Sequence, residues 1–143
     1  MEKFKYFFIL GFIIFGLAGY GYFKSIPGAD EGNENLPKIE ITPKNFNFGE
    51  ANYGEILEHN FKIKNLGKEI LEIKRVATSC ACTSAKAVLE KIQPGQETNL
   101  TVTYDTAAMS GSHGRGKQER IIYVKSSDPI NPQAEVIIYA NVK

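Results

Sequence analysis

The chain has 143 residues, and its 17 Lys and Arg against 16 Asp and Glu give a formal net charge of +1. This length is enough for one domain behind an N-terminal leader. The charges are spread along the chain without a clustered basic stripe, which excludes a dedicated nucleic-acid-binding surface.

The N-terminal segment is apolar. Tyr6–Phe23 is a run of 18 residues without a charge. As a helix it would span about 27 Å, close to the hydrocarbon thickness of a bilayer. Lys3 and Lys5 precede the run, so the positive-inside rule keeps the N-terminus in the cytoplasm and exports the rest. Residues 1–24 are therefore predicted to be a membrane anchor or a signal peptide, and cleavage after Ala18 is the alternative left open.

A polar linker and one folded domain follow this segment. Residues 25–36 contain Gly, Pro, Asn and acidic residues and have almost nothing to bury, which predicts a flexible tether. In residues 37–143 the dominant hydrophobic period is two. Between Leu57 and Ile63, for example, apolar side chains and His59 fall on one face and polar side chains on the other. This alternation is typical of a half-buried strand.

Similar short alternating runs continue to the C-terminus, separated by turns such as Gln93–Gln96, and no amphipathic helix interrupts them. The pattern predicts an all-β fold: an immunoglobulin-like antiparallel β-sandwich of seven to eight strands, preceded by the N-terminal transmembrane or signal helix. The core is predicted to contain Phe48, Phe61, Ile63, Leu71, Ile73, Leu100, Val102 and Tyr104.

The order of several short motifs resembles a known family. These are Phe46–Glu50 with Gly54, the run Phe61–Gly67, Ser79-Cys80-Ala81-Cys82-Thr83, Ile92–Gly95, Val102–Asp105 and Ser126–Pro129. Together they resemble the bacterial domain-of-unknown-function family 1573, which is similar to hydin-like and major-sperm-protein-like immunoglobulin folds. Ala81 stands where the family usually has Gly. The resemblance implies a fold, an envelope location and an interaction module, but no established activity.

The pair Cys80-x-Cys82 has the most chemical promise. On an extended strand the two Cα atoms would lie about 6.6 Å apart. That is the upper limit for a disulfide, so a bridge needs a local turn. Two thiolates on one side can instead hold Cu(I), and a thiol-exchange role also stays open. The plainer alternative is that both cysteines only pack, or form a redox-inert bridge.

Three other side chains are weaker candidate ligands. His59 lies on an apolar strand face, where a lone His usually packs. Met109 and His113 lie in the long loop at 106–117 and would complete a copper site only if that loop folds over the cysteines. Without that folding, the loop is a solvated hairpin connection.

The same loop contains a false nucleotide-binding motif. Gly111–Lys117 matches the first seven positions of a P-loop, but Gln118 stands where Ser or Thr must reach Mg²⁺, and a strand is predicted where a helix is required. Nucleotide binding is therefore rejected. No Ser/His/Asp set is visible either, and the chain is not expected to be an enzyme.

These observations predict a non-enzymatic module tethered to the cytoplasmic membrane, with its domain periplasmic or extracellular, or secreted if the leader is cleaved. Its expected partner is another envelope protein or peptide, bound through exposed sheet edges or loops. The alternative is an envelope thiol-redox or Cu(I)-binding protein built on Cys80 and Cys82. No other cofactor is expected.

Overall fold

The computed structural model describes residues 35–109 and 111–143. These residues form nine strands and a short 3-10 helix, η1, with no α-helix. The elements in chain order are β1 (Ile39–Thr42), β2 (Asn45–Ala51), β3 (Ile56–Asn65), β4 (Leu71–Thr78), β5 (Thr83–Ala87), β6 (Lys91–Ile92), β7 (Glu97–Asp105), η1 (Gly111–Gly114), β8 (Gly116–Ser126) and β9 (Gln133–Val142).

The expected anchor at 1–24 and nearly all of the tether at 25–36 lie outside the described residues. Among the residues that the structure does describe, no helix is long and apolar enough to cross a membrane.

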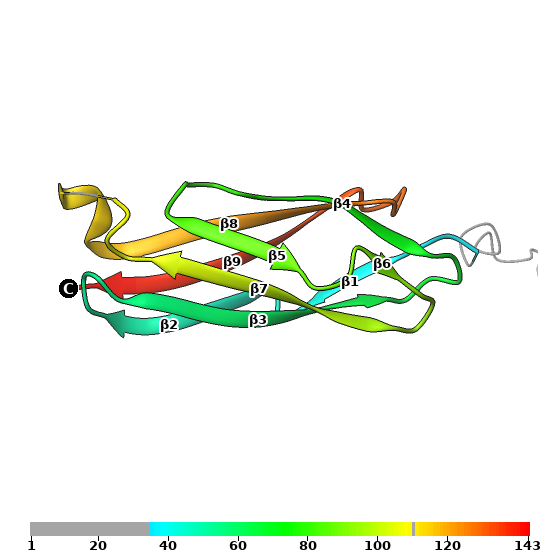
Figure 1. The fold of residues 1–143 in the computed structure, drawn as a ribbon, viewed down its shortest axis with the longest axis horizontal. Helices are drawn as coiled ribbons and strands as arrows, with labels where there is room; N and C mark the ends of the chain where they lie inside the picture. The colour runs from blue at the N-terminus through cyan, green and yellow to red at the C-terminus, as the bar shows by residue number, and fades with distance from the viewer. Residues whose placement is uncertain (1–34, 110) are drawn as a thin grey trace, which may run out of the picture. The chain divides into compact units, whose positions relative to one another are not determined.

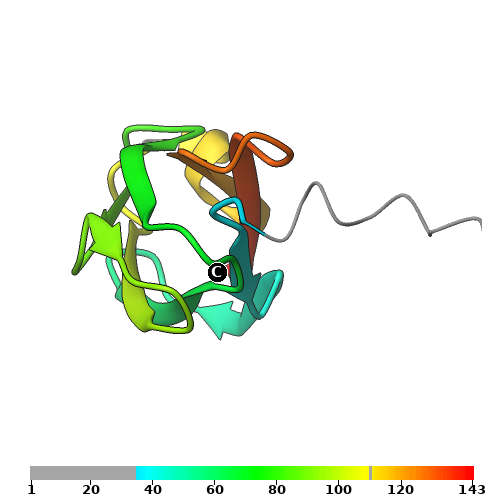
Figure 2. The same cartoon turned by 90° about the vertical axis from the view of Figure 1, so that its right-hand side faces the viewer.

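The strands form two sheets that enclose one interior (Figures 1 and 2). One sheet has the order β1-β3-β7-β5, and the other has the order β2-β9-β8-β4-β6. β1 and β2 follow each other in the chain, with a bend at residues 43–44 between them. Pro43, which follows a cis peptide bond, separates them. Proline has no amide to continue a ladder, and the chain changes sheets there: β1 pairs with β3, and β2 pairs with β9.

The predicted all-β, immunoglobulin-like sandwich is confirmed for the described residues. The strand number differs, because nine strands replace the expected seven or eight. The break at Pro43 adds a strand, and so does β6, which is only two residues long. The arrangement is not fully antiparallel either, since β2 and β9 run parallel. Period two in a sequence indicates which residues share a face, but it carries no information on the direction of the neighbouring strand.

The core is made from the inward faces of both sheets. Seven of the eight predicted core residues are buried, and Phe48 is half-buried and packs against them. β7 alternates exposed or half-buried positions with buried ones along its whole length, as period two requires. Its Leu100 pairs with Phe61 of β3. The fully buried side chains include Phe61, Ile63, Leu71, Ile92, Leu100, Val102, Ile122, Val124 and Val136.

Two buried polar side chains fix one end of the sandwich, which we call the anchored end. The first is Asn65, which is fully buried at the end of β3. Its Nδ2 donates to the carbonyls of Glu69 and Ile92, at 2.8 and 2.9 Å. Its Oδ1 accepts from the amides of Lys38 and Gly67, at 3.3 and 2.9 Å. A single amide group therefore joins the chain before β1, the β3–β4 turn and β6.

The second is Asp128, in the turn between β8 and β9, which is 2% exposed. Its Oδ2 accepts from the amide of Ile39 at 2.9 Å, and its Oδ1 accepts from the amides of Ile130 and Asn131. Burial acts to raise the pKa of Asp128, but the backbone N–H groups and the charge of Lys38 outweigh it, and the pKa is lowered. Asp128 thus binds the start of β1 as a carboxylate.

Candidate functional site

Cys80 and Cys82 lie in the loop between β4 and β5, at the opposite end of the sandwich, and form a disulfide. Their Cα atoms are 5.3 Å apart, less than in an extended strand, because residues 79–82 make a turn. The local turn that a disulfide between these two cysteines requires is therefore present. Ala81 fits where Gly is usual, since no residue other than glycine has a positive φ in the described chain.

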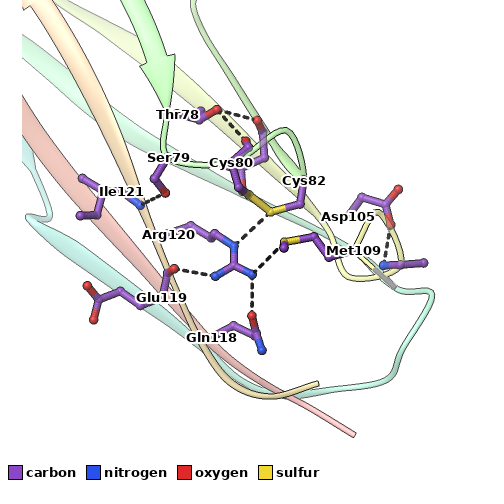
Figure 3. Close-up of a disulfide and its surroundings, with 12 residues drawn as sticks. Thr78, Ser79, Cys80, Cys82, Asp105, Met109, Gln118, Glu119, Arg120 and Ile121 are labelled. Carbon is purple, nitrogen blue, oxygen red and sulfur yellow. Dashed lines mark hydrogen bonds between the residues drawn. A yellow bond between two sulfur atoms is a disulfide. The ribbon is translucent and has the colours of Figure 1, made fainter. Parts of the chain in front are cut away.

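Hydrogen bonds from three directions hold this loop (Figure 3). Thr78 Oγ1 donates to the carbonyls of Cys80 and Thr83, at 3.0 and 2.9 Å. Ser79 exchanges two bonds with the backbone of Ile121 in β8. The amide of Asp105 donates to the Cys82 carbonyl at 2.9 Å. The turn carrying the disulfide is thus fixed to both sheets.

Arg120 of β8 lies directly against the disulfide (Figure 3). Its Nε donates to Cys82 Sγ at 3.0 Å, and its Nη1 donates to the Glu119 carbonyl at 2.7 Å. Its Nη2 donates to Gln118 Oε1 and, at 3.7 Å, to Met109 Sδ. The guanidinium also lies 5.3 Å from the centre of the Tyr104 ring, within the range of a cation–π contact.

The charge environment of Arg120 is unusual. No carboxylate in the described part of the chain forms an ion pair with it. Its neighbours are sulfur, a carbonyl, an amide and an aromatic ring. Burial raises the pKa of Tyr104, and the guanidinium opposes that rise. This half-buried cation therefore has only uncharged acceptors among the described residues, one of them a cysteine sulfur.

The structure brings one of the two predicted loop ligands to this site. Met109 is half-buried and shares the Arg120 guanidinium with Cys82. His113 is exposed on η1. No group of three or more His, Cys, Asp or Glu side chains able to hold a metal occurs in residues 35–109 and 111–143. Thiolates are the metal ligands of cysteine, so copper binding at Cys80 and Cys82 concerns the reduced pair and stays a prediction.

His59 lies inside an aromatic cluster rather than in a ligand set. Its ring stacks on Phe46 with centroids 3.6 Å apart, and it meets Phe48 and Phe61 edge to face. Its Nε2 is buried and has no hydrogen-bond partner among the described residues. Burial lowers the pKa of His59, so the imidazole packs in its neutral form.

The P-loop-like segment has the local structure that its sequence indicates. η1 covers Gly111–Gly114, and β8 begins at Gly116. A strand therefore follows the glycines where a nucleotide-binding loop is followed by a helix.

Arg120 was not predicted from the sequence. Its signal was present, because Gln118, Arg120, Ile122 and Val124 are spaced by two and share the inward face of β8. A charged residue in register with buried aliphatic residues marks a position where the interior supplies polar partners.

The sheet edges form a second candidate surface. Most edges carry a feature that hinders further pairing: Asp128 occupies the outward amide of Ile39 in β1, β2 has a register shift between Asn47 and Glu50, and β6 has two residues. Among the described strands, β5 pairs only with β7. Its ladder is regular, from Thr83 opposite Tyr104 to Ala87 opposite Leu100.

The backbone of β5 presents polar groups outward. The amide of Val88 donates to Asn99, and the amide of Asp105 donates to the Cys82 carbonyl. Since antiparallel bonding alternates, even-numbered residues bond to β7, and Ala85 and Ala87 direct their amides and carbonyls away from it. A hollow of about 540 Å³ beside this strand is lined by Ser84, Ala85, Lys86, Val88, Thr101 and Thr103.

Comparison with known proteins identifies relatives by sequence and by fold. The family model described as "Protein of unknown function (DUF1573)" matches residues 39–142. Among curated proteins, none matches the sequence.

Several solved structures share the fold. A Porphyromonas gingivalis W83 protein of unknown function has a TM-score of 0.67 at 21% identity, over 82% of this chain and 51% of that one. A PapD-like domain of human CEP192 has a TM-score of 0.59 at 13% identity, over 82% and 91%. The chaperone YadV has a TM-score of 0.55 at 12% identity, over 73% and 52%. The chain thus spans about half the length of the Porphyromonas and YadV proteins.

Proposed function

Because the chain belongs to the DUF1573 family, whose description names no activity, we propose a function from its geometry: a non-enzymatic module that binds an extended segment of another protein along β5. The observation that carries this proposal is the outward backbone of Ala85 and Ala87 on a regular edge strand. A peptide that adds a strand to such an edge gains main-chain hydrogen bonds, and side-chain pockets provide specificity.

Two further features support binding at β5. Ala85 and Ala87 are small and point inward, so they do not obstruct an approaching strand. Lys86 is exposed in the middle of the edge and favours an acidic side chain on the partner. The fold is shared with YadV, which is itself described as a chaperone.

Crosslinking in intact cells tests this proposal. A photo-crosslinking residue at Lys86 should give a discrete protein adduct, and the same residue at Glu135, exposed on β9, should not. Ala85→Pro removes the outward N–H donor without breaking a bond to β7, and proline is tolerated at such edge positions, so the domain should still fold. Because a partner strand would lose a main-chain hydrogen bond there, the adduct should be abolished. Ala85→Ser keeps the amide and is the matched control. Equal labelling at both positions would contradict the proposal.

We also propose that the module is exported and held by its N-terminal segment. The uncharged run Tyr6–Phe23 behind Lys3 and Lys5 supports this orientation. Alkaline phosphatase fused after Leu36 should be active, since that enzyme needs an oxidising compartment for its disulfides. An inactive fusion made at normal levels would refute export. Retention of the intact leader in purified protein, read by mass spectrometry, distinguishes an anchor from a cleaved signal.

A thiol-redox or Cu(I)-binding role of Cys80 and Cys82 is the second candidate. The observation in its favour is that Cys82 and Met109, both sulfur-containing, lie together against the guanidinium of Arg120. After mild reduction, the protein should bind Cu(I) against a competing chelator if the pair holds copper, and Cys80→Ser with Cys82→Ser should abolish that binding. Thiols that neither bind copper nor react would leave only a packing role.

A further inference from the structure

The two sulfurs of the disulfide have different surroundings. Cys80 is half-buried, whereas Cys82 is 4% exposed. Both sulfurs lie near Thr83 Oγ1, at 3.5 and 3.7 Å. Of these two sulfurs, only that of Cys82 accepts a hydrogen bond from the guanidinium of Arg120. An attacking thiol can therefore reach Cys80 more easily, while the charged donor contacts the other sulfur.

Reduction strengthens the contact between Arg120 and Cys82. A disulfide sulfur is a weak, uncharged acceptor, whereas a thiolate carries a full negative charge and forms a charge-assisted hydrogen bond. No described carboxylate neutralises Arg120. Gln118 and Met109 already hold the guanidinium in position, so little reorganisation is needed. Arg120 thus stabilises the reduced pair more than the oxidised one.

We propose that this disulfide exchanges with an external protein thiol, that Cys80 is the sulfur attacked, and that Cys82 leaves as a thiolate held by Arg120. The inference rests on the thiol-redox role named as the second candidate function, and it assigns a part to each residue. Arg120 acts as a positioning residue, because it acts through Cys82.

The exchange takes two steps. The incoming thiolate forms a bond to Cys80 Sγ, the Cys80–Cys82 bond breaks, and its electron pair moves to Cys82 Sγ. A second thiol of the same partner then attacks the mixed disulfide and releases Cys80 as a thiolate, which takes up a proton. The partner dithiol is oxidised to a disulfide and the pair Cys80 and Cys82 is reduced, a two-electron transfer.

An equilibrium measurement tests the part of Arg120. The full-length protein is equilibrated with reduced and oxidised glutathione, and free thiols are counted by alkylation and mass spectrometry. Arg120→Met should lower the equilibrium constant for reduction about tenfold, or about 30 mV for a two-electron couple. The matched control is Arg115→Met, since Arg115 contacts the Tyr53 ring and not the disulfide. It should change the constant less than twofold.

Mapping the adduct tests which sulfur is attacked. Wild-type protein is exposed to reduced glutathione, quenched with acid and alkylated, and the mixed disulfide is located by peptide mass spectrometry. We expect glutathione on Cys80 and the alkyl group on Cys82. The reverse distribution would overturn the assignment. A reduced protein dithiol that reacts at least tenfold faster than glutathione identifies a protein as the source of the thiol, and equal rates would overturn that part of the proposal.

A further measurement does not depend on the folding of Arg120→Met. In Cys80→Ser, with Arg120 intact, the thiolate absorbance of Cys82 should titrate below the ordinary thiol pKa of about 8.5. Titration at or above that value would overturn the role of Arg120. A disulfide that no thiol reduces would refute the thiol-redox function itself, whereas exchange with equal constants in wild type and Arg120→Met would refute only the part given to Arg120.

Discussion

The polar side chains at the two ends of the sandwich have different kinds of hydrogen-bond partner. At the anchored end, Asn65 and Asp128 bond to backbone groups whose chemistry never changes. At the other end, which we call the disulfide end, Arg120 lies against a sulfur whose charge changes on reduction. At one end, polar side chains with all their hydrogen bonds made to the backbone fix the position of the chain. At the other end, the hydrogen bond from Arg120 changes in strength with the redox state of Cys82.

Substitutions at the anchored end should cost the most. Asp128→Ala leaves the amides of Ile39, Ile130 and Asn131 without their acceptor. It should lower the free energy of unfolding by about 3 kcal/mol, because bonds to a charged group are the stronger ones and buried donors are left unpaired. Urea denaturation measures the loss. Asp128→Asn keeps an oxygen acceptor and should lose less, and an equal loss would show that the charge itself dominates.

The pH dependence of this contribution has a definite sign. The folded-state pKa of Asp128 lies below its ordinary value of 3.8, so the unfolded chain binds the proton first on acidification. The stabilisation from Asp128 is present above that value and is lost as pH falls through the folded-state pKa. Asp128→Asn should lack this component in a series of urea titrations.

Asn65→Ala should cost about 2 kcal/mol, since it removes four hydrogen bonds, two to the carbonyls of Glu69 and Ile92 and two from the amides of Lys38 and Gly67. The matched control is Asn60→Ala on the same strand, because Asn60 is exposed and, within the described residues, its side chain has one hydrogen bond, accepted from Thr101. It should change the free energy of unfolding by less than about 0.5 kcal/mol. Equal effects at the two positions would contradict the anchoring role.

Removing the disulfide should lower the free energy of unfolding less than replacing Asp128 or Asn65. Cys80→Ser with Cys82→Ser opens a loop with only one residue between the cysteines. So short a loop restricts the unfolded chain little, and the loss should not exceed about 2 kcal/mol. The protein should keep its fold by circular dichroism. A loss larger than that of Asp128→Ala would reverse the comparison between the two ends.

The smallest effect is expected at His59. Burial lowers its folded-state pKa below 6.5, so the unfolded chain binds more protons as pH falls below that value. Stability should therefore decrease from pH 6.5 downward until the folded-state imidazole is also protonated. His59→Leu keeps an apolar contact with Phe46 and should remove this part of the slope between neutral and mildly acidic pH.

The sequence predicted the fold better than the site, for a physical reason. Alternation reports burial directly, which is why Phe61, Ile63, Leu100 and Val102 were placed correctly. Asn65 and Asp128 lie in stretches rich in turn residues, where polar side chains are ordinary. Their burial depends on β1 and β6, which arrive from distant parts of the chain. The bridge between Cys80 and Cys82 could not be predicted for a similar reason, since it needs a turn that Ile121 and Asp105 hold from other strands.

The position of β1 has a consequence for reach. β1 begins at the anchored end beside Asn65 and Asp128, so whatever precedes residue 39 joins the domain there. The disulfide lies near the other end, since Cys82 bonds to Asp105, which pairs with Ile56 at the start of β3. The ten residues of β3 extend about 30 Å between the two ends. In a protein tethered through the residues before 39, the disulfide would lie at the end of the domain farther from the tether. Asn65 and Asp128 would lie at the nearer end, where a pull on the tether would act first.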